Sequence, residues 1–293
     1  MLLPKFDFYE PSTVDEACKT MAEPDLSARP IAGGTDLIVN MKKGILSPKH
    51  LVSLSRIADL KEIYPSNGTL TIGACLTVAE LAESDKIGKT FSALALGAVS
   101  LGSPLIRNLA TIGGNLGSSR PAADLPPSLI AYGARVVLKK TSGERVVPLE
   151  DFFRGPGQTV MDPDEILTQV VVDEPPPCSG AGYIKLGVRK ALEISLVNVA
   201  AFLSLDGPDG AIASARVVLG SVAPIPIRAP SAEQTLTGEK PGDGLFEKAG
   251  EAAARDSRPI DDFRGSAEYR RAMVQVLTQR ALKMAFENAK KNS

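Results

Sequence analysis

The chain has 293 residues, which is enough to bury a sizeable core and suggests about two domains. Lysine and arginine total 33 against 34 aspartates and glutamates, so the net charge of -1 gives no basic surplus to attract nucleic acid or an anionic membrane. The cysteines Cys18, Cys75 and Cys178 lie far apart, and the single histidine, His50, has no partner cluster. Zinc, iron–sulfur, serine–histidine and cysteine–histidine chemistry all lack their usual residues, so redox chemistry would need an organic cofactor.

Neither a signal peptide nor a membrane span is expected in this chain. Residues 1–7 contain no long apolar stretch, and we expect no signal peptide. No segment approaches the roughly twenty apolar residues of a membrane span. We therefore expect a cytoplasmic protein, and we expect His50, at a predicted strand start, to be structural.

The first fifty-odd residues predict a small unit of short strands and helices. Thr13 and Glu16 form a capping-box pattern, which places a helix over residues 14–21. Asp36 is expected to cap a second helix whose apolar positions continue to Ile45. The strands expected here cover residues 6–9, 30–32 and 51–54.

The middle of the chain alternates strands with helices. Thr77 and Glu80 form another capping box, and apolar spacing predicts a longer helix over residues 91–101. Pro126 and Pro127 are expected to break the chain. The expected strands cover residues 69–74, 134–139, 145–147 and 166–172, with the second and third forming a hairpin.

The three prolines at 175–177 predict a linker into a second section. Strands are expected at 183–186, 196–203 and 215–220, and helices at 245–255 and 267–288. In the last helix, the residues expected to face the core are Tyr269, Met273, Val276 and Leu277.

Two short glycine stretches are the main functional signal. Residues 31–37 (IAGGTDL) and 110–116 (ATIGGNL) each place a glycine pair behind a hydrophobic residue and before a small polar one. A glycine pair permits positive φ angles and lets consecutive backbone N–H groups point at one anion. Two such loops suggest a pyrophosphate held from both sides. A single pair would be typical of an ordinary turn, and neither stretch fits the nucleoside-triphosphate loop or the Rossmann fingerprint.

The run from Gly102 to Asn115 (GSPLIRNLATIGGN) resembles the signature of the flavin-binding subunit of molybdenum hydroxylases. This group includes carbon monoxide dehydrogenase, xanthine dehydrogenase and nicotinate-type dehydrogenases, and the resemblance runs nearly end to end. It implies an α+β chain with a two-subdomain FAD-binding fold of the vanillyl-alcohol-oxidase or PCMH type over residues 1–176. The subdomains would cover about 1–55 and 56–176. A C-terminal domain with an antiparallel sheet and helices would cover 178–293.

The resemblance also implies non-covalent FAD, with its diphosphate held by the two glycine loops. Asp124 and Lys185 match family positions near the flavin cofactor, although Asp124 could instead cap a turn and Lys185 could be a solvated surface lysine. Arg107 and Asn108 are expected to brace the second loop. The expected cofactor contacts are Ile31, Ala32, Gly33, Gly34, Thr35, Asp36, Leu37, Thr111, Gly113, Gly114, Asn115, Asp124, Leu167 and Lys185.

These features predict an electron-transfer subunit of a molybdenum hydroxylase, with no catalytic residue and no metal site in this chain. The resemblance implies a molybdenum-cofactor large subunit and a 2Fe-2S small subunit as partners, in a dimer of heterotrimers. Electrons would pass from the 2Fe-2S clusters to FAD, and then to NAD+, a quinone or oxygen.

Two alternatives remain open at this point. A self-contained flavin-dependent oxidoreductase of the same fold would use Glu193, Arg189 or Tyr183 as acid or base. A flavin-free scaffold would contain the glycine pairs as ordinary turns. The run from Val188 to Ile194 departs from the family pattern, so the sequence does not predict what lies against the flavin face.

Overall fold

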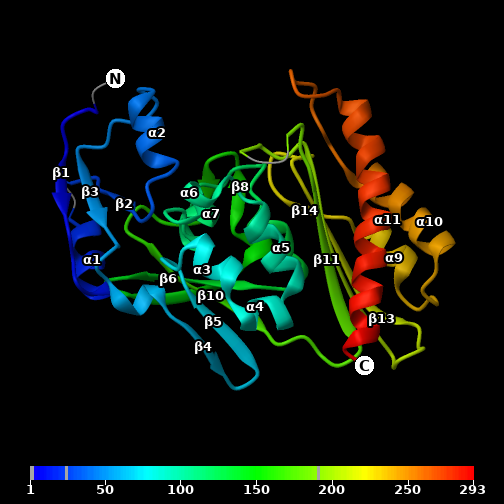
Figure 1. The fold of residues 1–293 in the computed structure, drawn as a ribbon. Coiled ribbons are helices and arrows are strands. Elements are labelled where there is room, and N and C mark those ends of the chain that lie inside the picture. The colour runs from blue at the N-terminus through cyan, green and yellow to red at the C-terminus, as the bar shows by residue number, and fades with distance from the viewer. Residues whose placement is uncertain (1–2, 24–25, 190–191) are drawn as a thin grey trace.

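A computed structural model describes residues 3–23, 26–189 and 192–293 and confirms the predicted mixture of helices and sheets (Figure 1). The N-terminal unit is a parallel sheet of order β1-β3-β2 flanked by two helices. Its elements are β1 (Asp7–Tyr9), α1 (Val14–Met21), β2 (Arg29–Ile31), α2 (Leu37–Lys42) and β3 (His50–Ser53).

Both helices of this unit differ in detail from the prediction. Thr13 caps α1, but the Glu16 carboxylate accepts hydrogen bonds from Ser12 and so does not complete a capping box. The helix α2 ends at Lys42, and Ile45 beyond it is 65% exposed rather than part of an apolar stripe. Asp36 makes no side-chain cap, because its carboxylate is engaged elsewhere.

An antiparallel sheet of order β4-β5-β10-β6-β7 forms the middle of the molecule. The predicted hairpin and capping box are both present, with Thr77 and Glu80 exchanging hydrogen bonds at the start of α3. The strands and short helices are η1 (Ala58–Lys61), β4 (Ile63–Ser66), β5 (Thr69–Gly73), β6 (Arg135–Lys140), β7 (Gly143–Pro148), η2 (Leu149–Asp151), β8 (Phe153–Gly155), β9 (Gln158–Thr159) and β10 (Ile166–Asp173). The α-helices are α3 (Val78–Glu83), α4 (Asp85–Thr90), α5 (Ser92–Ser100), α6 (Pro104–Arg107), α7 (Ile112–Gly117) and α8 (Leu125–Ala131).

Two expectations about this middle part are wrong. Pro126 and Pro127 do not break the chain but lie in the first turn of α8, where a missing N–H costs nothing. Gly113 and Gly114 lie within the helix α7 rather than in a loop. Both errors have one cause. Glycine and proline disfavour the interior of a helix, whereas these four residues lie in the first turns of α7 and α8.

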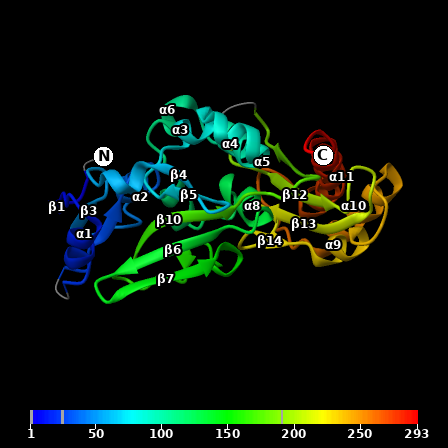
Figure 2. The ribbon, with the colours of Figure 1, turned by 90° about the horizontal axis from the view of Figure 1, so that it is seen from below.

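The C-terminal part is an antiparallel sheet of order β11-β12-β13-β14. Helices α9, α10 and α11 cover one face, and the other face meets α5 and α8, so the sheet stands between two helical layers (Figure 2). The elements are β11 (Ser179–Leu186), β12 (Val197–Leu205), β13 (Ile212–Gly220), β14 (Ile227–Arg228), α9 (Pro230–Leu236), α10 (Asp243–Asp256) and α11 (Ala267–Lys291). Within the described residues, no helix is both long and apolar enough to cross a membrane.

The buried face of α11 is rotated from the predicted one. Arg270 is 2% exposed, whereas Tyr269 points outward and Met273 and Val276 are only half-buried. The Arg270 guanidinium donates to the carbonyl of Leu196 and pairs with the Asp262 carboxylate, which offsets the cost of burying its charge. A pattern of apolar residues could not reveal this, because the partners come from distant loops.

Candidate cofactor-binding site

The first glycine stretch is an open loop between β2 and α2. Gly34 adopts the left-handed conformation, with φ of +68°, and all seven residues from 31 to 37 are half-buried. Within the described part of the chain, the backbone N–H groups of residues 33–37 have no protein acceptor. A run of unpaired N–H groups beside a left-handed residue is the arrangement that binds anions. This loop therefore offers donors to a phosphate.

The second glycine stretch is closed by its own contacts. Thr111 caps α7 by accepting from the N–H of Gly114 at 3.0 Å, and the N–H of Gly113 donates to the Ala74 carbonyl at 2.8 Å. A Cβ on Gly113 would lie only 2.7 Å from both Cβ and O of Ala74. The glycine pair here lets α7 pack against the turn after β5, and its N–H groups are already satisfied.

Within the described residues, Asn115 gives the second stretch a free acceptor, its side-chain amide oxygen, where the first stretch has free N–H donors. Its amide Oδ1 is buried, and it has no hydrogen-bond donor among the residues that the structure describes. Buried polar atoms are nearly always paired in folded proteins, so an orphaned acceptor indicates a missing donor. A ligand with hydroxyl or amide N–H groups would supply one.

The two stretches lie side by side. The backbone at Gly33 is so close to the Leu109 carbonyl that any side chain there would overlap with it. Asp36 accepts a hydrogen bond from the Ser118 hydroxyl at 3.0 Å and pairs with Arg120 at 3.4 Å. Ser118 and Arg120 thus tie the first loop to the end of α7. Sequence reasoning missed both residues, although Ser118 follows Asn115 at a spacing that shares a helix face.

Leu167 lies in β10 at the edge of the same region. The register of β10 against β6 shifts between Leu167 and Gln169, and the Thr168 carbonyl accepts from the N–H of Ala74. Because Ala74 in turn accepts from Gly113, the Leu167–Thr168 backbone is joined to α7 through a single residue. The side chain of Leu167 is buried in the core, so only its backbone is available to a ligand.

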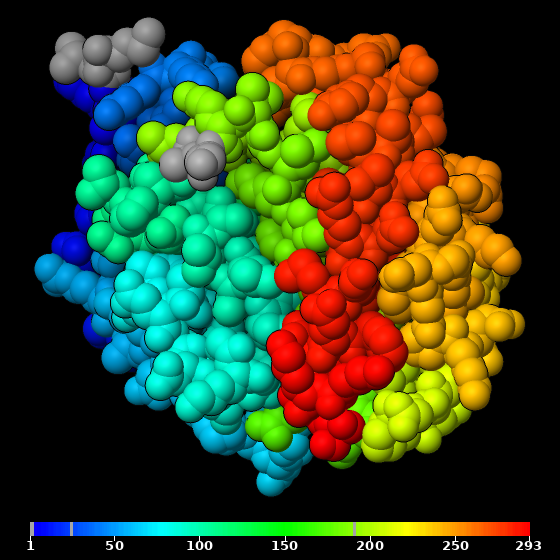
Figure 3. Space-filling view, turned by 45° about the vertical axis from the view of Figure 1, so that its right-hand side comes forward, coloured from blue at the N-terminus to red at the C-terminus, as the bar shows by residue number. Residues whose placement is uncertain are grey.

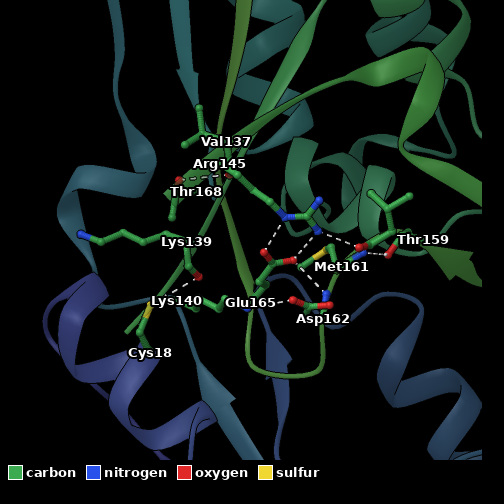
Figure 4. Close-up of polar contacts among 11 residues, drawn as sticks. Cys18, Val137, Lys139, Lys140, Arg145, Thr159, Met161, Asp162, Glu165 and Thr168 are labelled. Carbon is green, nitrogen blue, oxygen red and sulfur yellow. Dashed lines mark hydrogen bonds and ion pairs between the residues drawn. The ribbon is translucent and has the colours of Figure 1, made fainter. Parts of the chain in front are cut away.

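An ion pair fixes the start of β10. Figure 4 shows the Arg145 guanidinium reaching both carboxylate oxygens of Glu165, while the Thr168 hydroxyl donates to the Val137 carbonyl. Hydrogen bonds from Arg145 hold the pKa of Glu165 below its usual value. These contacts anchor the strand on either side of Leu167.

Asp124 and Lys185 contact each other. The Lys185 ammonium donates to Asp124 Oδ2 at 2.9 Å and to the Ser100 carbonyl at 3.0 Å, and the Tyr183 hydroxyl donates to Asp124 Oδ1 at 3.0 Å. Lys185 is not a solvated surface lysine, because its side chain is only 10% exposed. Asp124 does not cap a turn either, since its carboxylate points to β11.

Burial and hydrogen bonding act against each other at this pair. The pKa of Asp124 is raised above its usual value, because burial outweighs the charge and hydrogen bonds of Lys185, Tyr183 and Asn198, which lower it. Burial, together with the neighbouring Asp124 charge, raises the pKa of Tyr183 well above its usual value, so this phenol stays protonated. The carboxylate, the ammonium and the phenol form a buried network that joins α8 to β11. Sequence reasoning gave Tyr183 a role only in the alternative enzyme, although its i, i+2 spacing from Lys185 places both on one strand face.

The residues of the alternative enzyme do not form an acid–base group. Arg189 pairs with Glu193 at 2.8 Å, and hydrogen bonding from Arg189 lowers the pKa of Glu193. Tyr183 is engaged with Asp124. Among the described residues, no group of three or more histidines, cysteines or carboxylates could hold a metal ion.

The site as a whole fits a dinucleotide such as FAD. A diphosphate needs several N–H donors in a row, which residues 33–37 provide. The orphaned Asn115 amide oxygen would accept from the ligand, and the Asp124–Lys185 pair lies beyond α7 toward the C-terminal sheet. The consecutive unpaired N–H groups lie in the first glycine stretch, whereas in the second the N–H groups of Gly113 and Gly114 are already paired within the described residues.

Both parts of the chain match models of known protein families. Residues 4–175 match the family model of the FAD binding domain in molybdopterin dehydrogenase, and residues 182–285 match the CO dehydrogenase flavoprotein C-terminal domain. The carbon monoxide dehydrogenase medium chain of Afipia carboxidovorans is 32% identical, over 99% of this chain and 100% of that protein. The glyceraldehyde dehydrogenase medium chain of Sulfolobus acidocaldarius is 32% identical, over 97% of this chain and 99% of that protein.

A solved carbon monoxide dehydrogenase from Hydrogenophaga pseudoflava, which lacks the Mo-pyranopterin moiety, contains a similar chain with a TM-score of 0.93 and 30% identity, covering 98% of this chain and 99% of that one. Quinoline 2-oxidoreductase from Pseudomonas putida 86 gives a TM-score of 0.92 at 28% identity, covering 99% and 100%. The chain therefore belongs to the family of FAD-binding medium subunits of molybdenum hydroxylases.

Proposed function

We propose that this chain is the FAD-binding, electron-transfer subunit of a molybdenum hydroxylase. The observation that carries the proposal is the open loop at residues 33–37, whose consecutive N–H groups have no acceptor among the described residues. Its position in a fold matched end to end by flavoprotein subunits indicates FAD as the ligand. FAD, when bound, would accept electrons from the donor and pass them on to an acceptor.

The residues would share the work of holding FAD in the following way. The N–H groups at 33–37 bind the diphosphate, and Asn115 accepts a hydrogen bond from the ligand. The backbone at Leu167 supplies a further polar contact, and Lys185 provides a cation for the flavin end. We also keep the domain division at 1–176 and 178–293 and the subdomain boundary near residue 55 as proposals.

An exposed apolar surface favours a protein partner at this end of the molecule. We call it the apolar rim, and its residues are Leu105, Leu109, Val188, Leu192, Ile194, Ile260, Phe263 and Tyr269. Phe263 is 96% exposed, yet its loop is held by ion pairs from Arg264 and Arg270 to Asp262. A solvent-exposed aromatic residue on a loop held by ion pairs, with further exposed apolar side chains on adjoining segments, is typical of an interface.

The segments of the rim are linked to one another and to the site. The N–H of Leu192 donates to the Gly102 carbonyl, and Arg270 contacts the Leu196 carbonyl, so the three rim segments adjoin. Figure 3 shows the green segment before β12 between the teal α6 region and the orange segment before α11. Because Ser100 and Lys185 lie next to Gly102, the rim borders the proposed flavin end.

We infer that the rim is where an iron–sulfur partner subunit docks, since an electron donor must come close to the flavin. A molybdenum-cofactor subunit would complete a heterotrimer, commonly doubled. The relatives are medium chains or medium subunits by name, which supports assembly with other chains. We also propose a cytoplasmic location. We propose that the electrons leave the flavin to NAD+, a quinone or oxygen.

The first test is to titrate the purified chain with FAD and to measure absorption and bound cofactor. We expect one non-covalently bound FAD per chain and no iron–sulfur absorption. A folded chain that takes up no FAD would contradict the proposal. Purification of the assembly from the source organism, with each subunit and cofactor identified, tests the partners. Substrate turnover by the isolated chain would instead favour the self-contained enzyme.

A further inference from the structure

Lys185 of the Asp124–Lys185 pair begins a row of three residues that runs across the C-terminal sheet. Lys185 of β11 is paired in register with Asn198 of β12, which is paired with Gly220 of β13. Asn198 is fully buried, and its amide donates to the Ala123 carbonyl, next to Asp124, at 3.2 Å. The sheet therefore contacts the start of α8 through hydrogen bonds from two adjacent strands, one from Lys185 and one from Asn198.

Gly220 makes room for this arrangement. A Cβ at Gly220 would overlap with Oδ1 of Asn198, so a larger residue would displace the amide from the Ala123 carbonyl. Oδ1 of Asn198 has no donor among the described residues. Burying an amide that satisfies only one of its polar atoms is costly, which suggests that the remaining contact serves more than stability.

Tyr183 adds a second contact to the same carboxylate. Its hydroxyl donates to Asp124 Oδ1, while Lys185 donates to Oδ2, so both carboxylate oxygens have a donor from β11. Among the described residues, the charged or titratable groups that face Asp124 are Tyr183 and Lys185. Two uncharged groups lie beside them, the Asn198 amide from β12 and the Ser100 carbonyl from α5. The ammonium is held by Asp124 and Ser100 together.

We propose that Tyr183 and Asn198 are positioning residues that keep Asp124 ionised and Lys185 fixed, so that the C-terminal sheet sets the charge presented to bound flavin. This inference rests on the proposed function, because it assumes that FAD binds beside Lys185. With Asp124 ionised, the pair is neutral. When Asp124 takes up a proton, the Lys185 charge is no longer compensated and favours the more negative, reduced form of FAD.

The sign of the expected pH effect follows from the hydrogen bond. A donor to a carboxylate stabilises its ionised form, so removing the Tyr183 hydroxyl raises the pKa of Asp124. In Tyr183→Phe, Asp124 is therefore protonated at a higher pH, and Lys185 loses its counterion at that higher pH. Between the old and the new transition, the variant binds reduced FAD more tightly relative to oxidised FAD than the parent chain does.

Tyr132 provides a matched control at the same junction. It is also a buried tyrosine, its hydroxyl accepts from the Ala93 N–H at 3.3 Å, and its ring packs against Phe202 of β12. Its hydroxyl makes no contact with Asp124. Tyr132→Phe should therefore affect stability in a similar way without changing the charge near the flavin.

The experiment is to load each full-length chain with FAD and to measure its reduction potential from about pH 5 to about pH 8. We expect the transition in Tyr183→Phe to lie about one pH unit higher, with the ratio of reduced to oxidised FAD affinities changed up to about tenfold, or about 30 mV, between the two transitions. Tyr132→Phe should follow the parent curve.

Three outcomes separate the possibilities. Coincident curves for Tyr183→Phe, Tyr132→Phe and the parent overturn the positioning role while leaving FAD binding intact. A folded parent chain that binds no FAD overturns the proposed function and this inference together. If Tyr183→Phe does not fold, Asn198→Ser carries the same expectation, and an unchanged transition in that variant overturns the proposal.

Discussion

The two glycine stretches look alike in the sequence and do different work in the structure. Residues 33–37 form an open loop whose N–H groups have no acceptor among the described residues, whereas Gly113 and Gly114 lie in a helix whose first N–H groups are satisfied. In the first stretch, glycine shapes a donor loop. In the second, it permits close packing against Ala74. A glycine pair thus indicates that another group approaches the backbone closely, and that group is either a ligand or the protein itself.

The largest effect should come from Gly113→Val. Its Cβ would lie 2.7 Å from backbone and side-chain atoms of Ala74, and the added methyl groups would force α7 away from the turn after β5. We expect a loss of about 3 kcal/mol or more in the free energy of unfolding, measured by denaturant titration. Gly117→Ala in the same helix, where the new Cβ would have no neighbour within 4 Å beyond the backbone of its own helix, should instead stabilise by about 0.5–1 kcal/mol. Equal stability of the two variants would contradict the claim that Gly113 permits close packing of α7 against Ala74.

Gly34→Ala should affect the cofactor more than the fold. The left-handed backbone costs a non-glycine residue about 1–2 kcal/mol, and the new Cβ would lie 3.1 Å from Ile38 Cγ1. We expect the loop to shift and the dissociation constant for FAD to rise about tenfold, measured by quenching of flavin fluorescence. An unchanged FAD affinity in this folded variant would argue that the first stretch is not the phosphate loop.

Thr111→Ala tests the second glycine stretch, for comparison with Gly34→Ala in the first. It removes the oxygen that accepts from the Gly114 N–H at 3.0 Å, and losing such a cap costs about 1 kcal/mol of stability. The freed N–H lies at the start of α7, so FAD affinity should change less than in Gly34→Ala. Thermal unfolding with and without FAD measures both effects. A larger loss of affinity here than in Gly34→Ala would reverse the assignment of donors.

The smallest effect should come from Asp36→Asn, which weakens the tie between the stretches. Asp36 accepts from Ser118 and pairs with Arg120, but both charged side chains are about half exposed, so the ion pair contributes roughly 0.2–1 kcal/mol. We expect a small loss of stability that diminishes further at high salt. Unfolding measured at low and high ionic strength tests this, with Lys43→Gln as a charge-changing control on the next exposed turn.

Local patterns predicted much of the fold. The capping box at Thr77 and Glu80, the β6–β7 hairpin and the strand β10 all appear as expected, because caps, turns and strand alternation act over a few residues. The resemblance to flavoprotein subunits is confirmed by the comparisons. The chosen cofactor contacts stay predictions, although the structure brings both glycine stretches together.

The failures share a physical origin as well. Pro126 and Pro127 were expected to break the chain, and Tyr269 was expected in the core in place of Arg270. Each error treated a residue type by its average preference. The prolines are tolerated because they lie in the first turn of α8, and the arginine is buried because tertiary structure supplies partners. Arg270 can be buried because Asp262 and the Leu196 carbonyl meet its guanidinium.

The sequence by itself determined the periodic elements, the family resemblance and the two places where backbone must approach something closely. Only the tertiary structure decided which glycine stretch keeps free donors, and it alone showed that Lys185 and Asp124, 61 residues apart, pair with each other. The reason is that hydrogen bonds and ion pairs depend on which groups meet after folding. A sequence pattern reports the donors and acceptors of its own segment, but not those of the segment that packs against it.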